Sequence, residues 1–92
     1  MTLQHPAGRA LLSIFDRIYV INLAHRKDRR AEMEAQLLRV GLSFEHPQVT
    51  LFAASRFEEP GGFPTPGVRG CFMSHLRIQR EILRDDLRRV LI

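Results

Sequence analysis

The first candidate site residues follow the most apolar stretch of the chain. Residues 18–21 within the segment 17–23 are all β-branched or aromatic, a pattern that predicts a strand covered on both faces. Five candidates stand at or just after its carboxyl end: Asn22, Leu23, Arg26, Asp28 and Arg29. A guanidinium group can donate two hydrogen bonds at once to a phosphate, and α/β proteins bind phosphorylated ligands where a strand leads into a helix. The segment therefore indicates binding of an anion such as a diphosphate.

A structural reading of the same segment remains open. In that reading the cations form a solvated surface and Asp28 only caps the helix that follows. Spacing alone favours the solvated surface over ligand binding, because the segment is less specific than a glycine-rich phosphate-binding loop.

A second group of candidates lies near residue 70. Gly70 permits close backbone approach or unusual dihedral angles before a predicted helix. Ser74 and His75 would then fall near its first turn, where free amides and side chains can face a ligand. The structural alternatives are that Ser74 bonds back to the backbone and that His75 packs against the sheet. Cys71 is interpreted as a small buried hydrophobic residue.

Two adjacent carboxylates, Asp85 and Asp86, could in principle hold a divalent metal. They stand at the end of a predicted helix and just before Arg88 and Arg89. We therefore expect them to pair with arginines or to mark a turn. The sequence shows no metal site, no triad and no catalytic residue that we can name.

The elements that position these residues alternate between strands and helices. We expect strands at 17–23, 43–52 and 89–92, helices at 29–40 and 71–86, and a Gly- and Pro-rich loop at 54–69. Asp28 would be the N-cap of the first helix, Gly41 would end it, and Pro47 would place the second strand at an edge or interrupt it. Residues 1–8 read as a loose tail and 9–15 as one helical turn or a segment before the strand. The order β-α-β-loop-α-β predicts an α/β fold with a small parallel sheet.

Helical spacing also predicts which side chains face the core. The sets are Met33, Leu37 and Val40 on the first helix, and Phe72, Leu76 and Leu83, widened by Ile78 and Ile82, on the second. Arg77 and Glu81 are spaced for an ion pair one helical turn apart. We divide the chain into a tail, 1–16, and a single partial domain, 17–92.

Composition limits the protein classes. The chain has 92 residues, 45% of them hydrophobic and 26% charged, which argues against wholesale disorder. A formal net charge of +4 favours anionic partners. The single cysteine, Cys71, excludes an internal disulfide and fits a reducing compartment. With no signal peptide and no segment that could span a bilayer in the sequence, we expect the cytoplasm, with peripheral contact at the inner membrane left open.

The two candidate segments together resemble glycosyltransferase family 25, which includes lipopolysaccharide and lipooligosaccharide transferases and collagen galactosyltransferase domains. The likeness extends from residue 18 to residue 92. It rests on the strand Ile18-Tyr-Val-Ile-Asn-Leu23, then Arg26, Asp28, Arg29, Met33 and Leu37, the stretch Gly41, Leu42, Phe44 and Glu45, and the motif Gly70, Cys71, Ser74, His75 and Leu76.

This resemblance implies a GT-A-like fold that transfers a hexose, often galactose, from a nucleotide donor such as UDP-hexose to a glycan acceptor. It implies that Asn22, Leu23, Arg26, Asp28 and Arg29 surround the nucleotide, and that Gly70, Ser74 and His75 border the donor pocket. It also implies a divalent cation, Mn or Mg, held by an acidic motif that follows a strand beginning like 90–92. Because that motif is absent here, we expect the N-terminal part of such an enzyme, inactive alone.

Two other interpretations remain. Fourteen Lys and Arg residues favour a small basic module for nucleic acid or another polyanion. We expect no nucleic acid partner, because the arginines alternate with Asp and Glu and no stacking platform is evident. The other interpretation is a remnant without activity that self-associates through the free edge of strand 89–92.

Overall fold

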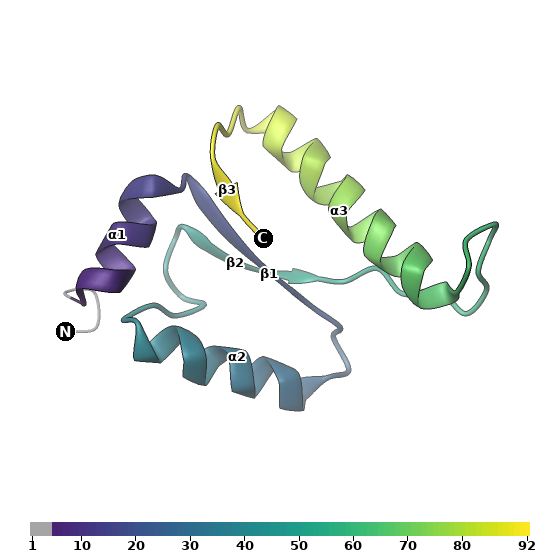
Figure 1. Ribbon diagram of the computed structural model, residues 1–92, viewed down its shortest axis with the longest axis horizontal. Helices are drawn as coiled ribbons and strands as arrows, with labels where there is room; N and C mark the ends of the chain where they lie inside the picture. Colours follow the sequence, from purple (N-terminus) through teal and green to yellow (C-terminus); the bar gives the residue numbers. More distant parts are fainter. Residues whose placement is uncertain (1–4) are drawn as a thin grey trace.

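The computed structural model describes residues 5–92 and shows an α/β fold in three layers (Figure 1). The elements are α1 (Pro6–Ile14), β1 (Arg17–Asn22), α2 (Lys27–Arg39), β2 (Val49–Ala53), α3 (Pro66–Arg84) and β3 (Val90–Leu91). The strands pair in the order β2-β1-β3, and both pairings are parallel. The predicted α/β class with a small parallel sheet is therefore confirmed.

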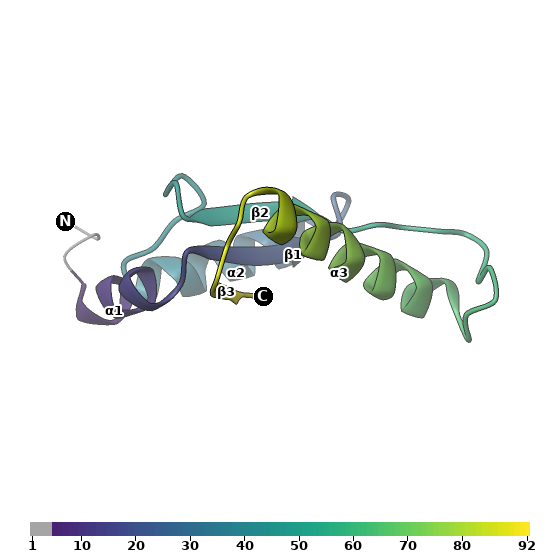
Figure 2. The ribbon, with the colours of Figure 1, turned by 90° about the horizontal axis from the view of Figure 1, so that it is seen from above.

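Alternate residues of β1 enter two separate apolar cores. Ile18 packs with Leu37, Leu42 and Val49 on the side of α1 and α2. Tyr19 packs on the opposite face of the sheet, in a cluster that also holds Phe52 of β2 and Ile78 of α3. The two clusters account for the layering, with α1 and α2 on one face and α3 on the other. The molecule measures 46 × 32 × 17 Å, and its thin direction is seen in Figure 2.

The N-terminal segment is more regular than predicted. Residues 6–8 belong to α1, so the loose tail assigned to 1–8 is wrong for them; residues 1–4 lie outside the described part of the chain. Gly8 is buried because α1 packs against the backbone carbonyl of Val40, and a Cβ at this position would collide with that oxygen. The packing of α1 on the sheet, which local spacing does not reveal, stabilises this helix.

The start of α2 differs from the prediction. The helix begins at Lys27, and its N-cap is Arg26, which makes no side-chain capping bond. Asp28 therefore lies in the first turn, and its predicted role as N-cap is wrong. The carboxylate of Asp28 instead accepts hydrogen bonds from Arg26 Nε at 3.1 Å and Nη2 at 3.0 Å.

The predicted end of α2 at Gly41 is confirmed. Gly41 has φ +79°, a left-handed conformation that favours glycine. Its N–H donates to Leu38 O at 3.1 Å, and the N–H of Leu42 donates to Leu37 O at 2.8 Å. These two bonds form a Schellman motif, in which Leu37 and Leu42 also meet in the core. The segment that follows turns until Val49, so the strand predicted at 43–52 occupies only Val49–Ala53, after Pro47.

The third helix starts earlier than predicted. The side chain of Thr65 accepts a hydrogen bond from the N–H of Val68 at 3.1 Å, and Pro66 takes the first helical position. A Thr N-cap followed by proline is a favourable helix start. The predicted start at residue 71 is wrong because we assigned these residues, with Gly67, to the preceding loop. Gly70 consequently lies inside the helix.

The buried face of α3 agrees with the prediction at Ile78 and Ile82 and differs from it at Phe72 and Leu83. Gly70, Ser74 and Ile78 are buried against the sheet. Phe72 is 53% exposed and Leu83 81% exposed, so the predicted core stripe through these two residues is wrong. The buried positions are four residues apart. Two of them hold small residues, a glycine and a serine, because the loop after β2 approaches the helix closely there.

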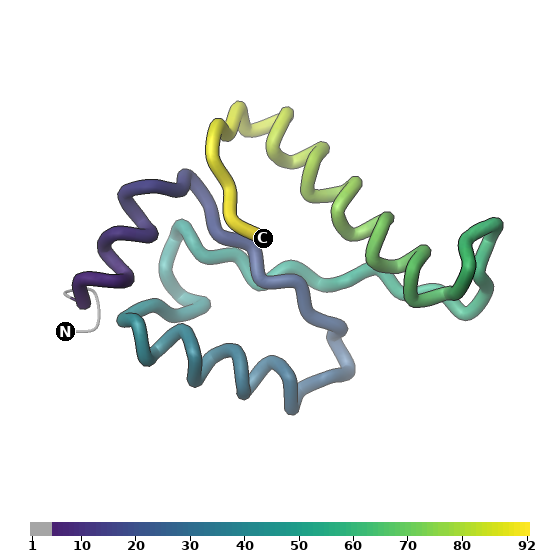
Figure 3. The backbone as a smooth tube through the Cα atoms, in the orientation of Figure 1, coloured from purple at the N-terminus to yellow at the C-terminus, as the bar shows by residue number. Residues whose placement is uncertain are grey.

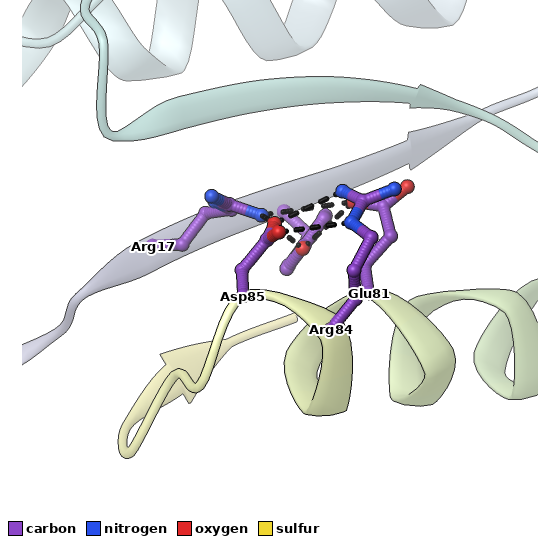
Figure 4. Close-up of polar contacts among 5 residues, drawn as sticks. Arg17, Glu81, Arg84 and Asp85 are labelled. Atoms are coloured by element: carbon purple, nitrogen blue, oxygen red, sulfur yellow. Dashed lines mark hydrogen bonds and ion pairs between the residues drawn. The ribbon is translucent and has the colours of Figure 1, made fainter.

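A polar network, instead of the predicted Arg77–Glu81 pair, joins the end of α3 to β1 (Figure 4). Glu81 accepts a hydrogen bond from the buried hydroxyl of Tyr19 at 2.9 Å. Arg17 donates to Asp85 at 2.8 Å, and Arg84 makes a second ion pair with the same carboxylate at 2.8 Å. The expectation that Asp85 pairs with arginines is confirmed. None of the helices in residues 5–92 combines the length and apolarity needed to cross a membrane.

This network predicts a pH dependence of stability. The guanidinium groups of Arg84 and, second, Arg17 hold the pKa of Asp85 well below its usual range. A lowered folded-state pKa contributes stability that is complete above about pH 5 and is lost as the pH falls through about 4 towards the folded value. We therefore expect urea denaturation midpoints of the wild type to fall more steeply below about pH 5 than those of Asp85→Asn.

The matched control for this prediction is Asp86→Asn. Asp86 lies outside the network and has φ +53°, which asparagine tolerates. Its midpoint should therefore fall with pH as the wild type does. Parallel pH profiles for the wild type and Asp85→Asn would contradict the prediction.

Candidate functional site

A pocket of about 640 Å³ opens at the carboxyl ends of β1 and β2. The two strands end together, since Asn22 is paired with Ala53. The opposite wall comes from the first half of α3, to which the chain returns through the long segment after β2 (Figure 3). In α/β proteins, ligands bind in the crevice outside the carboxyl ends of the strands. The pocket is therefore placed where a ligand is expected.

Seven of the eight site residues predicted from the sequence line this pocket: Asn22, Leu23, Arg26, Arg29, Gly70, Ser74 and His75. They come from three elements and from two segments more than forty residues apart. Asp28 is the exception, because it is not among the residues of the pocket wall. The geometry thus joins the two candidate segments in one site, and their binding of a nucleotide stays a prediction.

Arg26 reaches the pocket with its charge already compensated. Its two contacts to Asp28 form a bidentate pair, and this pair, with the N–H of Arg29, holds the pKa of Asp28 at about 2. Arg29 lies 3.5 Å from Glu32 in a pair exposed on both sides. Such exposed pairs are weak, so a phosphate can compete for either guanidinium.

Sequence reasoning missed a third arginine in the pocket, Arg56. Among the bonds described for residues 5–92, Arg56 makes neither a hydrogen bond nor an ion pair. No Asp or Glu is among the residues of the pocket wall. The signal that could have found Arg56 is its place, three residues after the end of β2, because the ends of neighbouring parallel strands lie at the same edge of a sheet.

Gly70 and Ser74 shape the pocket from within α3. A Cβ at Gly70 would lie 2.5 Å from the backbone oxygen of Ser55, so only glycine fits there. The hydroxyl of Ser74 donates to Gly70 O at 2.7 Å and accepts from the N–H of Ser55 at 2.8 Å. The structural reading of Ser74 is therefore the one observed, since its hydroxyl bonds to backbone groups and fixes the loop after β2.

His75 and Cys71 lie one turn apart on the exposed side of α3. The Nδ1 atom of His75 is 2.9 Å from the carbonyl oxygen of Cys71. Both side chains line the pocket, and Cys71 is exposed, so its interpretation as a buried hydrophobic residue is wrong. The expectation that Ser74 and His75 stand in the first helical turn is also wrong, because α3 begins at Pro66.

The divalent cation implied by the sequence resemblance finds no ligand set in the described residues. Across residues 5–92, no three His, Cys, Asp or Glu side chains are grouped so that they could hold a metal ion. Asp85 is engaged by Arg17 and Arg84, away from the pocket. The arginine side chains on the pocket wall have the chemistry that suits an anion.

Comparison with known proteins identifies the family. No protein-family model matches the chain, and no solved structure matches it. The chain is 36% identical over 106 residues to a Glycosyltransferase 25 family member of Drosophila melanogaster, which covers 98% of the chain and 17% of the relative. It is 32% identical over 100 residues to Procollagen galactosyltransferase 1-B of Xenopus laevis, covering 80% of the chain and 16% of the relative. The chain belongs to glycosyltransferase family 25.

Membership of family 25 does not by itself imply catalysis. The chain is also 32% identical over 103 residues to Inactive glycosyltransferase 25 family member 3 of Homo sapiens, across 95% of the chain and 17% of that relative. The family 25 chain therefore spans less than a fifth of the length of each of these relatives.

Proposed function

We propose that this family 25 chain is the N-terminal, nucleotide-sugar-binding portion of a glycosyltransferase with a GT-A-like fold. The whole enzyme would transfer a hexose, galactose, from a UDP donor to a lipopolysaccharide-type glycan in the cytoplasm, at the periphery of the inner membrane. The observation that carries the proposal is the pocket at the ends of β1 and β2, with three arginines and no carboxylate on its wall. A diphosphate is the anion that such a set of guanidinium groups suits.

The sugar, the acceptor and the compartment in this proposal rest on different observations. The name procollagen galactosyltransferase supports galactose as the sugar. The lipopolysaccharide acceptor rests on the sequence motifs alone. The cytoplasm rests on the single cysteine, Cys71, which fits a reducing compartment.

Binding of UDP to the 92-residue chain tests the proposal. We expect UDP and UDP-galactose to bind the wild type in titrations followed by NMR, and Arg56→Gln to weaken UDP binding about tenfold, the scale of one lost charge-assisted hydrogen bond. The matched control is Arg80→Gln, which removes the same charge from an exposed position of α3 outside the pocket and should leave the affinity unchanged.

A single-stranded RNA oligomer in the same titrations distinguishes a nucleotide site from a basic module that binds any polyanion. RNA binding with a steep decrease between about 50 and 200 mM salt, together with equal effects of Arg56→Gln and Arg80→Gln, would favour a general polyanion module over the nucleotide site.

We also propose that this chain does not transfer sugar alone. The described residues offer no metal-ligand set, and no Asp or Glu lines the pocket. Electrostatic stabilisation of the leaving diphosphate is a large part of catalysis in such transfers. Three arginines alone would bind the diphosphate in the donor as well as in the product, so they support binding more than turnover.

A further inference from the structure

The segment between β2 and α3 contains an aromatic ring that belongs to neither core. Phe57 is half-buried, lines the pocket beside Arg56, and is absent from both apolar clusters. The sequence shows no evident stacking platform, because most of its aromatic residues have the spacing of core residues. Phe63 and Phe72 are also outside both clusters, but Phe57 differs from them in lining the pocket.

One face of the Phe57 ring is already occupied. The guanidinium carbon of Arg69 lies 3.9 Å from the ring centroid, in a cation–π contact. Arg69 itself is not part of the pocket wall. The ring thus has a surface that lines the pocket besides the face that Arg69 covers.

Arg69 is held in place by the same loop. Its Nη1 atom donates to the carbonyl oxygen of Glu59 at 3.1 Å. Gly61, with φ +54°, passes so close that a Cβ there would lie 2.7 Å from the guanidinium carbon. A side chain fixed on three sides loses little further freedom when a ligand arrives, so the ring it supports is pre-organised.

The rest of the loop is fixed on α3 as well. Ser74 accepts a hydrogen bond from Ser55 N at 2.8 Å, and Arg77 donates to Ala53 O at 3.1 Å and to Ser55 Oγ at 3.0 Å. These contacts hold the backbone two residues before Phe57. The position of the ring is thus determined from both sides of the loop.

Building on the proposed function, we propose that Phe57 is the stacking platform for the base of a nucleoside diphosphate, and that Arg69 is the residue that positions it. The arginines on the same pocket wall would take the phosphates, so the two ends of one ligand have separate partners. Stacking of a base on an aromatic ring is largely indifferent to the identity of the base. The platform therefore supplies affinity for nucleosides as a class.

The test compares UDP with inorganic pyrophosphate on the intact 92-residue chain. Phe57→Leu keeps an apolar side chain and removes the aromatic face, and we expect it to lose about tenfold in UDP affinity, in the range of one lost base stack. Pyrophosphate binding should not change, because pyrophosphate has no base. The control is Phe63→Leu, which alters another aromatic of the same loop that contacts Phe72 outside the pocket and should change neither affinity.

A spectroscopic signature distinguishes stacking from a general loosening of the loop. On binding to the wild type, the uracil protons H5 and H6 should shift upfield in the ring current of Phe57. The shift should vanish in Phe57→Leu and decrease in Arg69→Met, in which UDP affinity falls while pyrophosphate affinity stays.

The outcomes separate the two proposals. UDP binding that is equally tight in the wild type and Phe57→Leu, or an upfield shift that persists in this variant, overturns the platform and leaves the nucleotide site intact. Full UDP affinity in Arg69→Met overturns the positioning role. A wild type that binds neither UDP nor pyrophosphate overturns the proposed function together with the platform.

Discussion

Replacing Gly70 by alanine is expected to destabilise the chain by about 2–3 kcal/mol, although alanine is the better helix former. The added Cβ would lie 2.5 Å from the carbonyl oxygen of Ser55, which is backbone and cannot rotate away. That backbone is also fixed by the bond from Ser55 N to the hydroxyl of Ser74. Relief of the clash would have to separate α3 from the loop after β2, and would break this bond.

The control for this prediction lies in the same helix. Gly67→Ala meets only Thr65 Oγ1, at 3.7 Å, which is an ordinary contact. We expect it to be neutral or to stabilise the chain by up to about 1 kcal/mol, the usual preference for alanine in a helix. Urea denaturation followed by circular dichroism measures both variants. Equal stabilities for Gly70→Ala and Gly67→Ala would show that the approach of Ser55 to the helix imposes no constraint.

The second large effect is expected from Ile78→Ala. Ile78 is 0% exposed and packs with Tyr19 and Phe52 on the α3 face of the sheet. Truncating a fully buried isoleucine costs about 2–5 kcal/mol in lost transfer free energy and in the cavity that remains. Small domains are stable by only about 5–15 kcal/mol, so a large unfolded fraction in mild denaturant is expected.

Leu83→Ala is the matched control on the same helix. Leu83 is 81% exposed, and surface substitutions of this kind usually change stability by less than about 0.5 kcal/mol. Denaturation midpoints of the two variants therefore show which side chain contributes more to the stability of the chain. A larger loss for Leu83→Ala than for Ile78→Ala would mean that the side of α3 that carries Leu83 packs in solution instead of the side that carries Ile78.

The first strand and the end of the first helix could be predicted because their signals are local. A run of β-branched residues at 18–21 and a glycine at position 41 act through the conformations of those residues themselves. The site is recoverable for the same reason. Parallel strands place their carboxyl ends at one edge, so the candidates after β1 are expected there, and the resemblance to family 25 joined the candidates of α3 to them.

The failures concern contacts between distant segments. The buried face of α3 is set by the approach of Ser55 to Gly70, and a glycine and a serine carry no hydrophobic signal. Phe72 and Leu83 carry a strong one and remain exposed. The residues Arg56 and Phe57 were missed because a loop has no periodicity from which the direction of a side chain could be predicted.

The short β3 has a consequence for the pocket itself. β3 pairs with β1 only at Arg17 and Ile18, so from Tyr19 onward β1 has a neighbour on the β2 side alone. Any strand that prolonged β3 in the same register would run beside Ile21 and reach Asn22, at the rim of the pocket. If the added residues touched the ligand, strand pairing along that edge and ligand binding in the pocket would be thermodynamically linked. Pairing would raise the affinity of the pocket for the ligand, and the bound ligand would stabilise the pairing to the same extent. This edge of β1 therefore borders the binding site at Asn22.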